Sequence, residues 1–473
     1  MLFFHAAIVS AESFINIVYI LCTMPFVRKI KKHSGTYLAL VESKWENGKP
    51  RQHVIKYLGK EVEGKAVRKV STSDLKVTQV RRHLDVEIID HLANELNLKQ
   101  LLSTPALIFV YAQLLERPSI NKMEEWLNET DILQALGIEK ITTVQLYEAL
   151  DKLQESDFSA TETSIAQFFA VHEPKQSLVI DVTDTYFEGE SIEEEPRRGK
   201  DGKVKRLIQI AIAVTQKNGF PIFHRIFPGN ILGKKIFTEM IRTLVPLGYS
   251  GAILDRGFYS AKNIDDALAL KLKLICGVVK DKHFKPILHG FDKEKLYRKE
   301  NRVILRNTHV YCTSMPFKEG RLVVVYNPVA EVIKRERFYD KGGEEEDAAF
   351  LGFSLIYHNT DFDDVEVVRK YFEKDVVERS FKQLKGVLSL RPVRVWLKTH
   401  VEAHVKICFV AYAVLSLLQF KISKLDVSAV DALGILKNGY RVKLCDSKSG
   451  FEWDVILELT KLQEQMRNLV YKN

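Results

Sequence analysis

SLVID at residues 177–181 and GAILD at residues 251–255 are two short apolar runs that each end in an aspartate. Between them lie two β-type runs around Asn218-Gly219, a dipeptide typical of hairpins, and a helix-like stretch at 234–247. A further helix and a further apolar strand follow the second run. This order predicts a mixed α/β layer in which the two acid-ending strands are neighbours. For either aspartate alone, an acid that caps the following turn is the commoner explanation.

The rest of the chain divides by pattern into segments on either side of this layer. On the N-terminal side, a basic hairpin is expected around Asn47-Gly48 and a polar linker at 61–81. Between this linker and the α/β layer, the spacing of apolar residues is typical of helices. Downstream, a long helix from Asp363 to Val387 and an apolar helix from His400 to Phe420 are expected. The predicted segments are an upstream extension (1–23), a basic β-hairpin segment and linker (24–80), a helical module (81–172), the first part of the core (173–280), a β-rich insertion (281–350), the second part of the core (351–425) and a C-terminal helical segment (426–473).

Composition fits a multidomain globular protein. The 473 residues are 46% hydrophobic and 28% charged, which argues against long disordered tracts. Lys and Arg outnumber Asp and Glu by 70 to 61, and the net charge of +9 suits a polyanionic partner, although many soluble enzymes are equally basic. The five cysteines form no CxxC pair, so neither a disulfide framework nor a zinc site is indicated and a reducing cytoplasm is expected.

The first 23 residues are apolar, but Glu12 and Asn16 interrupt the run and no basic stretch precedes it. A signal peptide or a membrane span is therefore a poor match. We expect an upstream extension with the natural start at Met24, and a real anchor or a docked helix is the alternative.

The long helix expected at 363–387 carries an acid among cations on one face. At about 100° per residue, one narrow arc holds Tyr371, Lys374, Glu378, Lys382 and Lys385, and the other side is apolar. One explanation is a solvated face with an ion pair between Lys374 and Glu378. The other is phosphoryl transfer, because three carboxylates can share two Mg²⁺ ions while Lys and Tyr hold the flanking phosphates.

These motifs together resemble the DDE transposases of bacterial and archaeal insertion sequences, in the insertion sequence 4-like group with a Y-(2)-R-(3)-E-(6)-K signature. The first-acid motif D-x-T matches at Asp181, and the second, D-R-G-F, matches at Asp255. The signature keeps its spacing with Lys in place of Arg, and its residues are Tyr371, Lys374, Glu378 and Lys385. The similarity runs from about Phe26 to Phe420.

The resemblance implies an RNase H-like core interrupted by a β-rich insertion, with Asp181, Asp255 and Glu378 as catalytic residues and ligands of two Mg²⁺ ions, or Mn²⁺ as substitute. It implies cut-and-paste DNA transposition by a homodimer on terminal inverted repeats and target DNA, in the cytoplasm at the nucleoid and without a membrane. Expected DNA contacts are Tyr371, Lys374, Lys382, Lys385 and Arg256, and the helical module at 81–172 is expected to bind DNA. An RNase H-like nuclease without strand transfer and a domesticated, non-catalytic DNA-binding protein are the alternatives.

Several assignments stay open at this point. Asp184 is a rival for the first acid, but residues three apart on a strand face opposite sides, so it cannot join Asp181 in one site. Arg256 fits a phosphate contact or a salt bridge within the core, and Trp396 fits base stacking or core packing. A cluster of basic residues fits phosphate contacts or a solvated face; its members are Arg28–Lys32, Lys76, Arg81 and Arg82.

Overall fold

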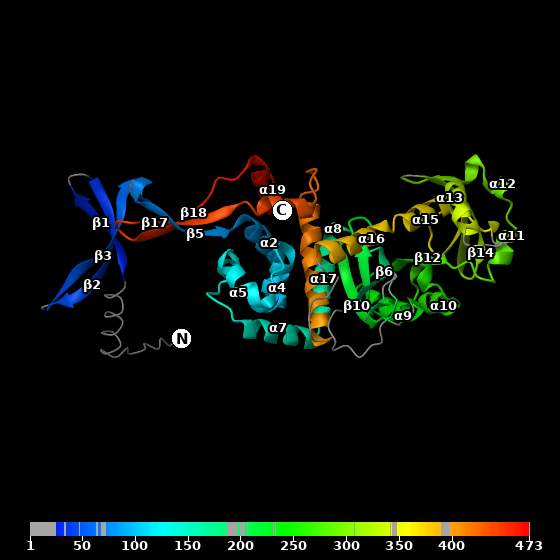
Figure 1. The fold of residues 1–473 in the computed structure, drawn as a ribbon, viewed down its shortest axis with the longest axis horizontal. Coiled ribbons are helices and arrows are strands. Elements are labelled where there is room, and N and C mark those ends of the chain that lie inside the picture. The colour runs from blue at the N-terminus through cyan, green and yellow to red at the C-terminus, as the bar shows by residue number, and fades with distance from the viewer. Residues whose placement is uncertain are drawn as a thin grey trace, which may run out of the picture. The chain divides into compact units, whose positions relative to one another are not determined.

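The computed structural model of the chain describes residues 25–32, 35–46, 48–62, 65–67, 72–186, 197–198, 204–205, 207–229, 231, 233–306, 308–340, 342, 348–388 and 398–472. It forms two compact units (Figure 1). Unit 1 comprises residues 1–79 and 442–455, and unit 2 comprises residues 80–441 and 456–473. The expected extension at 1–23 and Trp396 lie outside the described residues.

Unit 1 is built from antiparallel strands. One sheet has the order β1-β2-β3-β4, with β1 at Phe26–Lys32, β2 at Gly35–Glu46, β3 at Lys49–Val62 and β4 at Lys65–Val67. Glu46 pairs with Lys49, and Gly48 between them has a φ of 74°, which only glycine adopts easily. This confirms the hairpin predicted around Asn47-Gly48, although Asn47 itself lies outside the described residues.

A second sheet, with the order β18-β17-β5, departs from the sequence-based expectation. Strand β5 (Leu75–Arg82), preceded by the 3₁₀ turn η1 (Thr72–Asp74), occupies part of the expected linker. Strands β17 (Tyr440–Asp446) and β18 (Phe451–Ile456) lie in a segment expected to be helical. The Thr78 hydroxyl donates to the carbonyl oxygen of Lys443 at 3.2 Å. The partners lie more than 350 residues apart, so no local pattern reveals the pairing.

The first part of unit 2 is helical, as predicted. Its helices are α2 (Leu84–Glu95), α3 (Leu98–Leu101), α4 (Thr104–Leu115), α5 (Ile120–Asn128), α6 (Ile132–Ala135), α7 (Thr143–Glu155) and α8 (Ser159–His172). The predicted apolar helix is α17 (Lys398–Lys421), which packs against α4, α7 and α2 and against α18 (Ala429–Leu436) and α19 (Lys461–Tyr471). By length and composition α17 could cross a membrane, but 83% of its most apolar window is buried inside the unit, the environment of a core helix.

The second part of unit 2 is centred on a nine-stranded mixed sheet (Figure 1). Its spatial order is β10 (Pro221–Pro228), β9 (Leu207–Thr215), β6 (Ser177–Tyr186), β11 (Gly251–Leu254), β12 (Lys273–Val278), β16 (Phe353–His358), β15 (Gly320–Tyr326), β14 (His309–Phe317) and β13 (Arg302–Ile304). Strand β9 is antiparallel to β6 and β10, and β6, β11 and β12 are parallel. This confirms the predicted mixed α/β layer and the predicted neighbourhood of the two acid-ending strands.

The β-rich region expected as an inserted subdomain extends this sheet. Strand β16 pairs with β12 on one side and with β15 on the other, and β14 and β13 continue outward. A separate subdomain was predicted, but β16 joins β15, and with it the strands of the expected insertion, to β12 of the central sheet. The remaining elements of this region are α9 (Gly233–Leu244), η2 (Arg256–Phe258), α10 (Ala261–Ala269), α11 (Lys285–His289), α12 (Lys293–Leu296), η3 (Lys299–Asn301), α13 (Pro328–Tyr339) and the short strand pair β7 (Arg197–Arg198) and β8 (Val204–Lys205).

The long helix predicted at 363–387 is broken. It consists of α15 (Asp364–Phe372), α16 (Asp375–Lys382) and the π-helical turn η4 (Gln383–Val387). At the break, the amide of Val376 donates to the carbonyl of Glu373 at 3.3 Å, and that of Val377 to the carbonyl of Lys374 at 3.1 Å. These i→i+3 bonds tighten the chain and end the regular helix at Glu373 and Lys374. A single continuous helix was therefore the wrong prediction.

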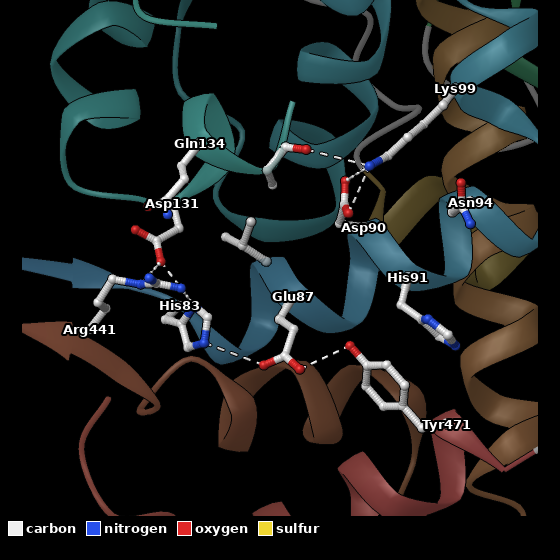
Figure 2. A pocket seen from close by; sticks show the side chains of 12 residues that line it. His83, Glu87, Asp90, His91, Asn94, Lys99, Asp131, Gln134, Arg441 and Tyr471 are labelled. Atoms are coloured by element: carbon white, nitrogen blue, oxygen red, sulfur yellow. Dashed lines mark hydrogen bonds and ion pairs between the residues drawn. The ribbon is translucent and has the colours of Figure 1, made fainter. Parts of the chain in front are cut away.

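A polar cavity of about 490 Å³ lies in the helical part of unit 2, beside α2 (Figure 2). Figure 2 shows Glu87 between His83 and Tyr471, and Asp131 against Arg441. Glu87 accepts a hydrogen bond from the Tyr471 hydroxyl at 2.9 Å, and Asp131 forms an ion pair with Arg441 at 2.7 Å. Since the carboxylates that line the cavity are engaged with neighbouring side chains, we interpret the cluster as structural: it ties α2 to α19 and to the start of β17.

Glu87 is the group whose ionisation most directly stabilises this cluster. Burial raises its pKa, but hydrogen bonds from His83, Arg467 and Tyr471 outweigh burial and lower the pKa from 4.5 to about 2. A carboxyl with a depressed pKa stabilises the folded state above its unfolded pKa and loses this effect as the pH falls. The shift corresponds to roughly 3 kcal/mol as an upper bound.

We therefore predict that Glu87→Gln lowers the free energy of unfolding at pH 7 by about 2 kcal/mol, because the charge-assisted bonds from α19 and His83 are lost. Urea unfolding followed by circular dichroism measures the difference. The gap to the unmodified protein should narrow as the pH falls from 4.5 towards 2. Glu125→Gln, at an exposed position on α5, is the matched control and should change stability little. Equal effects of both substitutions would contradict this role of Glu87.

Candidate functional site

Asp181 and Asp255 occupy neighbouring positions on adjacent parallel strands. Ile180 of β6 pairs in register with Leu254, the last residue of β11; Asp181 is the next residue within β6, and Asp255 directly follows the end of β11. Asp255 keeps an extended backbone, with φ of −74° and ψ of 162°. Because strands in register present equivalent residues on the same face, the two carboxylates share one face of the sheet. The strand register thus gives two of the three predicted acids equivalent positions beside neighbouring strands, and their role as site residues stays a prediction.

Lys374 and Tyr371 hold Asp255 from the break between α15 and α16. The ammonium of Lys374 lies 2.5 Å from Oδ1 of Asp255, and the Tyr371 hydroxyl lies 3.3 Å from the same oxygen. Lys374 also lies over the Tyr371 ring, 4.4 Å from its centroid. Burial raises the pKa of Asp255, but the hydrogen bond and charge of Lys374 outweigh it, so the net pKa is lowered. Asp255 is therefore held as a carboxylate.

The close approach of Tyr371 to the sheet depends on Gly277 in β12. A Cβ atom at Gly277 would lie 2.3 Å from the Tyr371 hydroxyl oxygen and 3.0 Å from the backbone nitrogen of Arg256. Such distances cannot be accommodated without movement, so a side chain at this position would push Tyr371 away from Asp255. Gly277 was not among the site residues predicted from the sequence. A glycine within the apolar strand KLICGVV was the signal, because it often marks close approach of another group.

Cys276, next to Gly277, is fully buried. Burial and the nearby charge of Asp255 raise the pKa of its thiol to about 12. A thiol in this state is inert as a nucleophile at neutral pH. Cys276 therefore packs behind the acidic site and adds no reactive group to it.

Glu378 lies on α16, on an exposed part of the helix, about one helical turn beyond Lys374. Helix α16 packs on β6 and β9 through Val376, Val377 and Phe381. The Tyr412 hydroxyl fixes it from α17, lying 2.6 Å from the Ser380 hydroxyl and 2.8 Å from the carbonyl oxygen of Gly219. Among the described residues no three His, Cys, Asp or Glu side chains lie close enough to hold a metal ion, so Glu378 is not gathered with the two aspartates.

The other predicted site residues differ in their surroundings. Arg256 follows Asp255 directly, is exposed, and has no ion-pair partner in the described part of the chain, which favours a phosphate contact over a salt bridge within the core. Lys382 is exposed at the end of α16. Lys385 lies in η4, but its side chain is outside the described residues.

Asp184 lies three residues along the regular strand β6 from Asp181 and therefore on the opposite face. There its carboxylate is 3.4 Å from the side-chain amide nitrogen of Gln209.

Two of the predicted phosphate contacts are engaged within the protein. Arg82 is buried and forms ion pairs with Asp85 and with Glu116, the latter at 2.6 Å. Arg81 lies 3.1 Å from Asp131. Breaking such buried pairs to reach DNA would leave carboxylates uncompensated. The assignment of Arg81 and Arg82 as phosphate contacts is therefore not supported by their positions.

Two of the three predicted metal ligands are suited by chemistry and position to a hard divalent cation. Asp181 and Asp255 offer carboxylate oxygens, the ligands that Mg²⁺ and Mn²⁺ prefer. Their shared face at the sheet would allow both to ligate one ion. Glu378 has the right chemistry and lies on a helix that packs on β6, but it would have to approach them. The residues present therefore fit a metal held first by the two aspartates.

Comparison with known proteins gives one family. A family model described as a transposase DDE domain matches residues 172–414. No curated protein matches. Among solved structures, a chain from a piggyBac transposase synaptic complex with hairpin DNA matches over 75% of this chain and 76% of that chain, with 13% identity and a TM-score of 0.40. A likeness at this level does not by itself establish a shared fold.

From the packing at Gly277 we predict that Gly277→Ala destabilises the protein by about 1–3 kcal/mol, because overpacking forces Tyr371 or the chain at Arg256 to move. Urea unfolding measures the change. Adding Tyr371→Phe should recover part of the loss, since it removes the oxygen that the new Cβ atom meets. Gly434→Ala in α18 is the control, because a Cβ atom there meets nothing within 4 Å. If Gly277→Ala proved as mild as Gly434→Ala, the close approach of Tyr371 would be refuted.

Proposed function

Because the chain belongs to the transposase DDE domain family, whose model matches half of it, we propose that it is a cut-and-paste DNA transposase of the insertion sequence 4-like group. It would cleave the DNA at the ends of a mobile element and join the freed 3′-hydroxyl groups to target DNA. Family membership carries the general activity of a transposase. The subgroup, the reaction sequence and the residues that perform it are the proposal.

The observation that carries the proposal is the in-register pairing of Ile180 with Leu254. It supports a joint role for the acids of the D-x-T and D-R-G-F motifs, which follow these paired residues within the segment that the family model matches. The strand order β10-β9-β6-β11-β12, with three consecutive antiparallel strands (β6, β9 and β10) followed by two parallel crossovers, supports an RNase H-like core for the same region. A turn-capping role would not require both acids on one face of adjacent strands.

Asp181, Asp255 and Glu378 would hold two Mg²⁺ ions, with Mn²⁺ as a substitute. When bound, such ions activate water or a 3′-hydroxyl and neutralise charge on the attacked phosphate. The chain's own contribution is positioning. β6 and β11 fix the two aspartates, and Tyr412 fixes α16, the helix that carries Glu378.

Exposed cations around the aspartates would hold the DNA strand. Arg256 and Lys382 are exposed and suited to phosphate oxygens, and Lys385 belongs to the same proposed set. Lys374 and Tyr371 are engaged with Asp255, so their proposed role on DNA requires them to exchange this carboxylate for a phosphate oxygen. Lys374 replaces the Arg of the signature and offers no bidentate fork, so we expect a weaker grip at that step.

The proposal includes a homodimer acting on terminal inverted repeats in the cytoplasm, at the nucleoid. The alternatives remain an RNase H-like nuclease without strand transfer and a domesticated DNA-binding protein without catalysis. They differ from a transposase in measurable products. A nuclease cuts but does not join, and a domesticated protein binds but does not cut.

We predict that Asp181→Asn, Asp255→Asn and Glu378→Gln each lower the rate of Mg²⁺-dependent cleavage by more than about a hundredfold, because each removes a charge from the ligand set. Binding of the same duplex should stay within about threefold. Cleavage of a plasmid that carries the element measures the rate, and electrophoretic mobility shift measures binding. Asp184→Asn is the matched control and should cut normally. A Glu378→Gln variant that cuts at the unmodified rate would remove Glu378 from the proposed site.

We also predict that the unmodified protein joins a pre-cleaved element end to a target plasmid in Mg²⁺. A 3′-hydroxyl end should give a joined product, and a 3′-deoxy end should give none, because the hydroxyl is the attacking group. Gel analysis of the labelled end measures this. Cleavage of the element without joining of either end would favour the nuclease alternative.

A further inference from the structure

Positive charge is dense in residues 25–79 of unit 1. They contain 13 Lys and Arg but 5 Asp and Glu, a net charge of +8 within 55 residues. The helical segment 81–172, expected to bind DNA, contains 7 Lys and Arg and 15 Asp and Glu, a net charge of −8. Because phosphate contacts supply much of a protein's affinity for DNA, this distribution favours unit 1 over the helical segment as the duplex contact outside the catalytic region.

Within unit 1, the far ends of β2 and β3 form a two-stranded ribbon, which we define as residues 42–46 and 48–53 (Figure 1). Strand β1 pairs with residues 35–41 of β2, and β4 pairs with residues 60–62 of β3, so neither covers the ribbon. Every residue from Arg51 to Tyr57 is exposed, on both faces of β3. A two-stranded ribbon is only marginally stable without a partner, and its cross-section fits the major groove of B-form DNA.

The two faces of the ribbon have different chemistry. On one face, Lys44 lies directly opposite Arg51, an arrangement of like charges that destabilises a strand pair. The neighbouring acids are engaged, Glu42 with Lys44 at 2.6 Å and Glu46 with His53 at 2.9 Å. Lys49 and Arg51 have no ion-pair partner within the described residues. A polyanion would relieve the repulsion and satisfy these cations.

The other face of the ribbon is apolar at its tip. Trp45 lies opposite Pro50, and 65% of the Trp45 surface is exposed. An exposed tryptophan beside a cationic face is typical of a binding surface, because it adds apolar contact where the charges provide attraction.

We propose that the ribbon binds duplex DNA, with Lys49 and Arg51 on the phosphates and Trp45 against the groove. This inference rests on the proposed function, which supplies DNA as the partner, and it moves duplex binding from the helical segment to unit 1. A second copy of the chain seated on the ribbon is the competing occupant. The excess positive charge argues against it, because two like-charged surfaces repel.

The test compares the full-length double variant Lys49→Ala/Arg51→Ala, and separately Trp45→Ala, with the unmodified protein on a mixed-sequence duplex. Loss of two phosphate contacts should weaken binding about tenfold near physiological salt and reduce the slope of log affinity against log salt by about 1.8. Trp45→Ala should weaken binding with the slope unchanged. The control Lys122→Ala/Lys140→Ala removes two exposed cations from the helical segment and should bind as the unmodified protein does.

Folding, DNA binding, plasmid nicking and assembly size together separate the outcomes. Circular dichroism checks that the variants fold, and their exposed positions make loss of the fold unexpected. Ribbon variants that bind with unmodified affinity and slope overturn the ribbon proposal, even if the protein nicks supercoiled plasmid in Mg²⁺ and the proposed catalysis stands. If the ribbon variants lose DNA binding but the unmodified protein never nicks plasmid, the ribbon proposal is supported and the proposed catalysis is contradicted. A smaller assembly by sedimentation, with binding restored at higher protein concentration, assigns the ribbon to a second copy and overturns the proposal.

Discussion

The parallel pairing of β6 with β11 is the constraint on which the candidate site depends. Since Ile180 lies opposite Leu254, the residue that follows each of them is an aspartate, and the extended backbone of Asp255 carries the alternation of faces one residue past the end of β11. Side chains alternate between faces with a period of two, so a slip of one residue would place one acid on the other side of the sheet. The residues that precede each aspartate are buried on both faces of the sheet, so their packing on each face holds this register.

The contacts around Asp255 link this constraint to the helix that carries the third acid. Lys374 and Tyr371 approach Asp255 only because Gly277 leaves space and because the helix breaks at Glu373 and Lys374. The ion pair keeps Asp255 charged despite its partial burial. Lys374 therefore has two proposed roles. It neutralises the Asp255 carboxylate, and it is expected to bind a DNA phosphate.

The sequence alone predicts those parts of the fold that depend on local pattern. Runs such as SLVID and GAILD, the turns at Gly48 and Gly219 and the apolar helix α17 carry their own signals. Pairings between distant segments carry none: β17 joins β5, and β16 joins β15 to the central sheet. The helix break escaped detection because residues 371–377 keep a helical pattern of polarity, while the contact with Asp255 is a tertiary one. Arg81 and Arg82 resembled free surface cations because two of their acidic partners, Asp131 and Glu116, are distant in sequence.

We propose that Asp181 and Asp255 hold a catalytic cation beside the paired strands β6 and β11. An anomalous difference map of the full chain crystallised with a DNA duplex and Mn²⁺ tests this most directly. A peak within coordinating distance of the Asp181 and Asp255 carboxylates is expected, with Glu378 near the same peak. Mn²⁺ bound elsewhere, with these two aspartates facing only protein groups while DNA is engaged, would contradict it.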